Sequence, residues 1–339
     1  MPDSGKPIDE SLKIAKRFAD SLPPPSSLFT SSIRAIKNAE GHIGDQNSKK
    51  LKDLTVSSTS FLVGVSPTLK TVFYRAAENL YREQLSALTA ITPRDLLSLF
   101  APNEVTGILA ITYLFRHIKK RCDAPEFERI IKKMLTHIEI GAIVGKTVRH
   151  IGSGNGILLA GARYMAFALF SMANLKTFQE MRRKIDKNDQ LFDLALETET
   201  FGCNHLQIAS ALIQTLGFGR TVCMGIAIDI KGEALDTFPE AVAEELLCWK
   251  IAITLTECFH RTGKAPVVSE DSELYLPEDE SEKLHKECWS VLRDGTSFTW
   301  LTASKKDLPA EIMASLDITV KEEPKSGMED LEEGEDAAG

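Results

Sequence analysis

The stretch TFGCNHLQIASALIQTLGF, residues 200 to 218, decides how this chain folds. Asn204 and Gln207 have the spacing of a capping box, so the pattern predicts a helix that starts at His205. The apolar residues that follow at helical spacing share one side of that helix: Ile208, Ala209 and Leu212. His205 lies on the same side. It is therefore either a metal ligand at the mouth of an active site or a structural histidine at a helix start.

The rest of the chain also has helical periodicity, with no sustained strand alternation and no series of hairpin turns. Ser66-Pro67 and Thr92-Pro93 each predict a helix start, with the hydroxyl residue as N-cap and proline in the first turn. Ser26 or Ser27 is a further N-cap after the rigid segment LPPP. We expect an all-α protein, a two-lobed helical bundle.

The most apolar segment is ILLAGARYMAFALFSMANL, residues 157 to 175, which approaches the roughly 20 residues that span a bilayer. Arg163 lies inside it, and Gly161 and Asn174 weaken it further. We therefore predict a helix buried in the core of the protein rather than a membrane span.

Net charge is distributed unevenly along the 339 residues. The last nineteen, KEEPKSGMEDLEEGEDAAG, hold eight acidic residues and two lysines, a net charge of −6. Since the whole chain carries −8, residues 1 to 320 carry only −2. A near-neutral body with an acidic tail gives no electrostatic reason to expect nucleic-acid binding. The composition of the tail is typical of a disordered segment.

The six cysteines are scattered and form neither a CxxC pair nor zinc-finger spacing, which favours free, buried thiols in a reducing compartment. The N-terminus MPDSGKPIDESLKIAKRF has no apolar stretch of the kind found in secretory signals. We expect a cytoplasmic protein that makes no contact with a membrane.

The glycine-rich segment GSGNG, residues 152 to 156, predicts a turn between two helices. Glycine-rich loops also bind phosphate where they open a helix, but this one follows a helical stretch and lacks the GxxxxGK[ST] pattern. Arginines on either side keep a second interpretation open, an anion site made of four residues: Arg149, Gly154, Gly156 and Arg163.

His137 resembles His205 in its surroundings, because apolar residues follow it at helical spacing. A histidine on an apolar helical face is more often a hydrogen-bonded core residue than a ligand. No HExxH, GxSxG or EF-hand pattern accompanies either histidine.

Five segments, in chain order, resemble the HDOD family of bacterial signalling proteins, which are related to HD-type phosphohydrolases: SLPPPSSLFTSSIRAI, SPTLKTVFYRAAENL, THIEIGAIVGKTV, LLAGARYMAFALFSMANL and FGCNHLQIASALIQTLGF. The resemblance runs from about Leu22 to His260. Its strongest part is the last segment, which is similar to the family's Phe-Gly-x-x-His-x-x-x-Ala/Gly-x-x-Leu helix. The family usually has Asp-Pro where this chain has Ser66-Pro67.

The resemblance implies an HD-like second lobe. In catalytic HD proteins one histidine, a later His-Asp pair and a distant aspartate hold metal. His137 corresponds to the first histidine, and His205 is a retained motif position. Ser171 and Met172 stand where the His-Asp pair belongs, and the paired histidines that often follow the LGF turn are missing from CMGIAIDIKG. We therefore expect a degenerate metal site, no cofactor and no catalysis.

The resemblance also implies a role. We expect a non-catalytic regulator of bacterial signal transduction that binds partner signalling proteins. One alternative is a metal-dependent HD-type phosphohydrolase of a nucleotide or cyclic dinucleotide, with ligands from unexpected positions: His150, Asp186, Asp189 or Asp229. The other alternative is a nucleotide sensor that does not hydrolyse its ligand.

The predicted organisation has five parts: an N-terminal helix or extension (1–21), an N-terminal helical lobe (22–122), an HD-like helical lobe (123–262), a linker with a C-terminal helical extension (263–319), and a disordered acidic tail (320–339).

Overall fold

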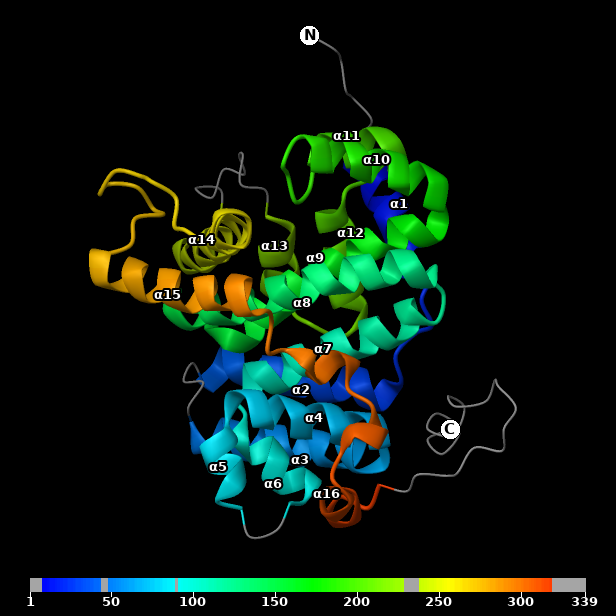
Figure 1. Cartoon of the computed structure of the whole chain (residues 1–339), viewed down its shortest axis with the longest axis vertical. Coiled ribbons are helices and arrows are strands. Elements are labelled where there is room, and N and C mark those ends of the chain that lie inside the picture. Colours follow the sequence, from blue (N-terminus) through cyan, green and yellow to red (C-terminus); the bar gives the residue numbers. More distant parts are fainter. Residues whose placement is uncertain (1–7, 44–47, 89–90, 229–237, 319–339) are drawn as a thin grey trace.

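Helix α9 (Gly152–Ala173) organises the structure, a computed structural model that describes residues 8–43, 48–88, 91–228 and 238–318. Every residue from Ser153 to Ser171 is buried. The helix is long and apolar enough to cross a membrane, but 89% of its most apolar window is enclosed by the rest of the protein. It packs against both α7 (Pro102–Lys119) and α8 (Ala124–Thr147), near the centre of Figure 1. The prediction of a buried core helix is confirmed.

The GSGNG segment forms the first turn of α9 and not the turn between helices that the sequence suggests. Its glycines allow the neighbouring backbones to come very close. A Cβ atom on Gly154 would overlap the backbone of Asn103 on α7. One on Gly156 would lie 2.6 Å from the carbonyl carbon of Gly141 on α8. The glycines therefore serve helix packing.

The N-terminal lobe consists of α2 (Ser27–Ile43), α3 (Lys49–Val65), α4 (Pro67–Leu80), α5 (Arg82–Ser86) and α6 (Pro93–Leu99), in the lower half of Figure 1. The predicted caps are confirmed: the side chains of Ser26, Ser66 and Thr92 accept backbone hydrogen bonds from the first turns of α2, α4 and α6. These caps satisfy amide groups that the helices themselves leave unpaired.

The second lobe surrounds α8 and α9 with α10 (Leu175–Lys187), α11 (Leu194–Phe201), α12 (His205–Thr215), α13 (Arg220–Ala227) and α14 (Glu240–Thr262). Helix α1 (Ile8–Ala19) packs on α12 of this lobe, although it starts the chain (Figure 1). Gln207 Nε2 donates to Ser11 Oγ at 3.0 Å across that contact. The described residues contain helices and no strand, so the predicted all-α class is confirmed.

Glu104 at the start of α7 links the two lobes. Its carboxylate accepts hydrogen bonds of 2.5 Å from the Tyr81 hydroxyl and 2.5 Å from the Ser153 hydroxyl. The Ala101 amide donates to it as well, at 2.8 Å. Glu104 is 2% exposed. Burial and this carboxylate together raise the pKa of Tyr81 far above 10, so the phenol stays protonated and keeps donating.

The C-terminal extension ties the lobes together a second time. Helix α15 (Glu278–Asp294) packs on α8 and α14, and the chain then crosses to α4 through η2 (Thr299–Thr302), η3 (Lys305–Asp307) and α16 (Ala310–Ser315). Buried Glu139 on α8 holds the start of this crossing. It accepts from the Thr296 hydroxyl, the Ser297 amide and the Ser297 hydroxyl at 2.6 to 2.7 Å. Trp300, which is fully buried, anchors η2.

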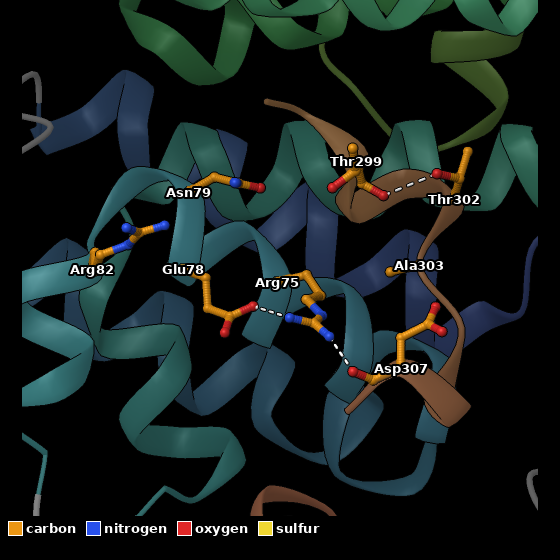
Figure 2. A pocket seen from close by; sticks show the side chains of 8 residues that line it. All are labelled: Arg75, Glu78, Asn79, Arg82, Thr299, Thr302, Ala303 and Asp307. Atoms are coloured by element: carbon orange, nitrogen blue, oxygen red, sulfur yellow. Dashed lines mark hydrogen bonds and ion pairs between the residues drawn. The ribbon is translucent and has the colours of Figure 1, made fainter. Parts of the chain in front are cut away.

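Where the extension meets α4, a recess of about 390 Å³ remains. Figure 2 shows that Arg75 reaches from α4 to the extension. Its guanidinium contacts Glu78 at 2.6 Å and donates to the carbonyl oxygen of Asp307. The recess is open to solvent, and these contacts join the extension to α4.

The predicted acidic tail, residues 320–339, and Asp229 lie outside the described residues. The six cysteines are free, and all but Cys258 are buried, in agreement with the expected buried thiols.

Candidate functional site

Polar side chains from five helices meet inside the second lobe. Together with the Phe192 ring from the segment before α11, we call them the histidine cluster: His137 on α8, Arg163 and Tyr164 on α9, Glu197 on α11, His205 on α12, and Glu257 and His260 on α14. His137, Glu197 and His205 are fully buried, and Arg163 is 3% exposed. Buried polar groups cost free energy unless they are paired, so their partners define what the cluster does.

His205 is held at both ring nitrogens. The Asn204–Gln207 capping box fixes the helix start, as the sequence predicts. The backbone amide of His205 and its Nδ1 both approach Glu197 Oε2, at 2.8 Å and 2.7 Å. Arg163 Nε donates to Nε2 at 3.2 Å. Because arginine can only donate, Nε2 carries a lone pair and Nδ1 carries the proton, so the ring is the neutral Nδ1–H tautomer.

Arg163 is the positive charge of the cluster. Its Nη1 lies 2.5 Å from Glu257 Oε1, and its guanidinium carbon lies 5.1 Å from the centre of the Phe192 ring. Phe192 in turn stacks on His205, with 4.1 Å between ring centres and 26° between planes. Arg163 thus bridges the α12 histidine and the α14 carboxylate while an aromatic ring covers its face.

His137 pairs with His260, 123 positions later in the chain. Their Nδ1 atoms are 2.7 Å apart, so one ring donates and the other accepts. Burial is the main reason that the pKa of His137 lies well below 6.5, and neighbouring imidazoles and Arg163 add to it. Burial, with the charges of Lys133 and Arg182, lowers the pKa of His260 to about 4. Both rings are therefore neutral near pH 7.

This pair predicts a loss of stability in mild acid. A histidine whose pKa is lower in the folded protein binds more protons when unfolded, so the stabilisation is complete above about pH 6.5 and is lost as pH falls toward 4. His260→Gln removes one titrating ring and keeps a donor for His137. Between pH 6.5 and 4.5 the wild type should lose about 1 kcal/mol per pH unit more than this variant.

Urea unfolding across that range measures the difference. His42→Gln, at an exposed position on α2, serves as control and should keep the wild-type slope. Equal slopes for the wild type and His260→Gln would show that the pair does not control the acid response.

The Ser171 and Met172 side chains have partners of their own. Ser171 Oγ donates to the Ala168 carbonyl oxygen at 2.7 Å and lies 3.0 Å from Cys122 Sγ. Met172 is half-buried and packs against the apolar core. Among the residues that the structure describes, no group of three or more His, Cys, Asp or Glu side chains is arranged to hold a metal ion.

The four residues of the candidate anion site do not surround one space. Arg149 is exposed and pairs with Glu244 at 2.9 Å. Gly154 and Gly156 face α7 and α8 in the first turns of α9. Arg163 lies inside the histidine cluster, about 16 Å along the helix axis from the start of α9 at 1.5 Å per residue.

The other residues considered as metal ligands are also separated. Asp186 is bound by Arg182 at 2.6 Å and Lys133 at 3.2 Å, and these partners keep the pKa of its carboxyl low despite an opposing effect of burial. His150 lies 3.7 Å from Glu244, on the exposed side of the α8–α9 junction. Asp189 is exposed and adopts a left-handed backbone with φ of 51°.

Sequence reasoning missed the partners that complete the cluster: Tyr164, Phe192, Glu197, Glu257 and His260. Glu257 and His260 are three residues apart on α14, a spacing that places both on one side of a helix. That pattern, and the lone arginine in the most apolar helix, are the two signals that could have indicated them.

The comparisons support the fold. No family model matches the sequence, and neither does any curated protein. A crystal structure of a protein assigned to signal transduction from Marinobacter aquaeolei VT8 is similar, with a TM-score of 0.55, 18% identity and coverage of 87% of this chain. This chain spans 65% of the length of that protein.

Two further solved structures have lower scores. An HDOD domain protein of unknown function from Geobacter sulfurreducens has a TM-score of 0.47 and 16% identity, over 92% of this chain and 98% of that one. A protein assigned as a phosphohydrolase from Shewanella amazonensis SB2B has a TM-score of 0.45 and 10% identity, over 90% and 97%. At these identities the similarity concerns the fold alone, and activity has to be argued from the site.

Proposed function

We propose that this chain is a non-catalytic, HDOD-like regulatory protein of bacterial signal transduction, which acts in the cytoplasm by binding partner proteins. The observation that carries the proposal is the state of the two motif histidines. Both nitrogens of His205 are engaged by Glu197 and Arg163, and His137 Nδ1 is engaged by His260.

The chemistry of metal-dependent hydrolysis requires more than these residues offer. A catalytic metal needs about three protein ligands and an open position for water or substrate. Here the Nδ1 atoms of His137 and His260 contact each other, and the two ring nitrogens of His205 contact Glu197 and Arg163. Glu257, the carboxylate at the edge of the cluster, is paired with the same arginine. A metal ion bound to His205 or Glu257 would lie beside the buried Arg163 guanidinium, which is unfavourable because both carry positive charge.

This proposal makes a prediction about metal and His205. Protein purified without chelator should hold little tightly bound manganese, iron or zinc, and adding these ions should not raise its Tm specifically. His205→Ala should lower the free energy of unfolding by about 1–3 kcal/mol, because it leaves buried partners unpaired and opens a small cavity. Elemental analysis, thermal unfolding and phosphodiester hydrolysis assays measure these quantities.

His42→Ala serves as control because this histidine is exposed. If stoichiometric metal and hydrolysis were found in the wild type and lost together in His205→Ala, the phosphohydrolase hypothesis would replace the non-catalytic one.

The proposal that this chain binds a partner protein needs its own test. Tagged wild-type protein in its native host should retain a defined signalling protein through affinity purification and mass spectrometry, and the purified pair should bind each other directly. A thermal-shift panel of nucleotides tests the sensor alternative. Specific stabilisation by one nucleotide, with no protein partner, would overturn the proposal.

A further inference from the structure

One side of the second lobe is strongly basic. Side chains of helices α8 and α10 meet there, through Lys133–Asp186 at 3.2 Å and Gln179–Glu126 at 3.1 Å. We call it the α8/α10 basic face, after its exposed cations: Arg129, Lys132, Lys133, Lys176, Arg183, Lys184 and Lys187. Against these seven stand three exposed acidic residues on the same helices, Glu128, Glu180 and Asp186, which leaves a net charge of +4.

Few of these cations form ion pairs with the described part of the chain. Arg129 contacts Glu126 at 3.3 Å and Lys133 contacts Asp186, but the rest make no ion pair with any residue that the structure describes. Helix α10 buries one narrow stripe, Phe178, Met181 and Ile185, so its charged side is free for solvent or a ligand. The body of the chain carries −2 in total, and the face is therefore a local concentration of positive charge.

The opposite charge is on the same chain. Residues 321–339 carry −6, and residues 1–320 carry −2. We propose that residues 321–339 bind the α8/α10 basic face of their own chain. In this arrangement the acidic segment competes with any acidic partner for the face and sets how strongly that partner must bind. The proposal is independent of the one made above for partner binding.

The length of the segment allows this contact. Twenty-one residues follow Ile318, and an extended chain of that length spans about 70 Å. A compact domain of this size has a radius of gyration of about 20 Å, so the face is within reach. Because the two parts are covalently linked, the effective concentration of the acidic segment is in the millimolar range, and weak contacts suffice.

The expected contact is electrostatic. Exposed ion pairs contribute little each and are screened by salt. The acidic segment is favoured over a nucleic acid as the occupant because it belongs to the same chain, which gives it a high local concentration at the face.

Zero-length carbodiimide cross-linking of the full chain tests the proposal, since it joins carboxylates to lysines only where they touch. Mass spectrometry should find the acidic residues of 321–339 linked mainly to Lys132, Lys133, Lys184 and Lys187. In about 1 M salt, where the Debye length is about 3 Å, these links should disappear.

The variant R129Q/R183E lowers the charge of the face and keeps every lysine that can react. Its links should fall about tenfold if several exposed ion pairs are lost. The matched control R34Q/R94E changes exposed arginines on α2 and α6 and should keep the wild-type pattern. Links spread evenly over surface lysines, or links that R129Q/R183E leaves unchanged, would overturn the proposal. The loss of cross-links in high salt tests the proposal on the wild-type protein alone, so this result does not depend on whether a variant folds.

Discussion

Gly156→Ala is expected to destabilise the protein by about 3 kcal/mol or more, enough to unfold much of it at moderate temperature. The added Cβ would lie 2.6 Å from the carbonyl carbon of Gly141 and closer still to its oxygen. Both atoms belong to the backbone of α8, so no flexible side chain can move aside. Helices α8 and α9 would have to separate, and they form the centre of the core.

Gly41→Ala is the matched control. This glycine is also helical, on α2, but a Cβ there has no atom within 4 Å. Alanine should leave stability unchanged or raise it by up to about 1 kcal/mol, because glycine loses more conformational freedom on folding. Urea unfolding followed by circular dichroism measures both variants. Equal stability of Gly156→Ala and Gly41→Ala would show that α8 and α9 are not packed as closely as the structure has them.

Much of the fold follows from local sequence patterns. Hydroxyl residues before proline at Ser66 and Thr92, and the Asn204–Gln207 pair, identify helix starts because capping depends only on residues three positions apart. The burial of residues 157–171 follows from their composition. These features needed no knowledge of the tertiary structure.

The GSGNG segment shows where local reasoning fails. Glycines are typical of turns, so the sequence favours a turn at residues 152–156. The structure has helix there. Glycine is required in this helix because α7 and α8 approach so closely that side chains would not fit. Only the tertiary contacts of Gly154 and Gly156 distinguish the two roles.

The histidine cluster could be predicted only in part, for the same reason. The sequence marked His137, His205 and Arg163 as polar groups on apolar helices. It could not pair His137 with His260, since that contact joins α8 to a helix more than a hundred residues away. The resemblance to the HDOD family draws attention to the histidines and says nothing of the arginine between them.

Arg163→Met is the second substitution with a large expected effect, a loss of about 2–4 kcal/mol in the free energy of unfolding. Methionine fills much of the volume but supplies neither charge nor donor. Glu257 loses its cation and His205 Nε2 loses the hydrogen-bond donor that Arg163 supplies. Removing one partner of a buried ion pair typically costs about 3–5 kcal/mol, and the 26% exposure of the Glu257 side chain reduces that figure.

Two further variants distinguish the contribution of the ion pair to stability from the contribution of side-chain packing. Arg149→Met removes an arginine that pairs with Glu244 at the surface, where the two side chains are 75% and 50% exposed, and should change stability by less than about 0.5 kcal/mol. The double variant Arg163→Met/Glu257→Leu should recover part of the loss, because no charge is then left without its partner. If Arg163→Met is as stable as Arg149→Met, the guanidinium does not hold the cluster together. Arg163 would then not be the group that keeps metal away from His205.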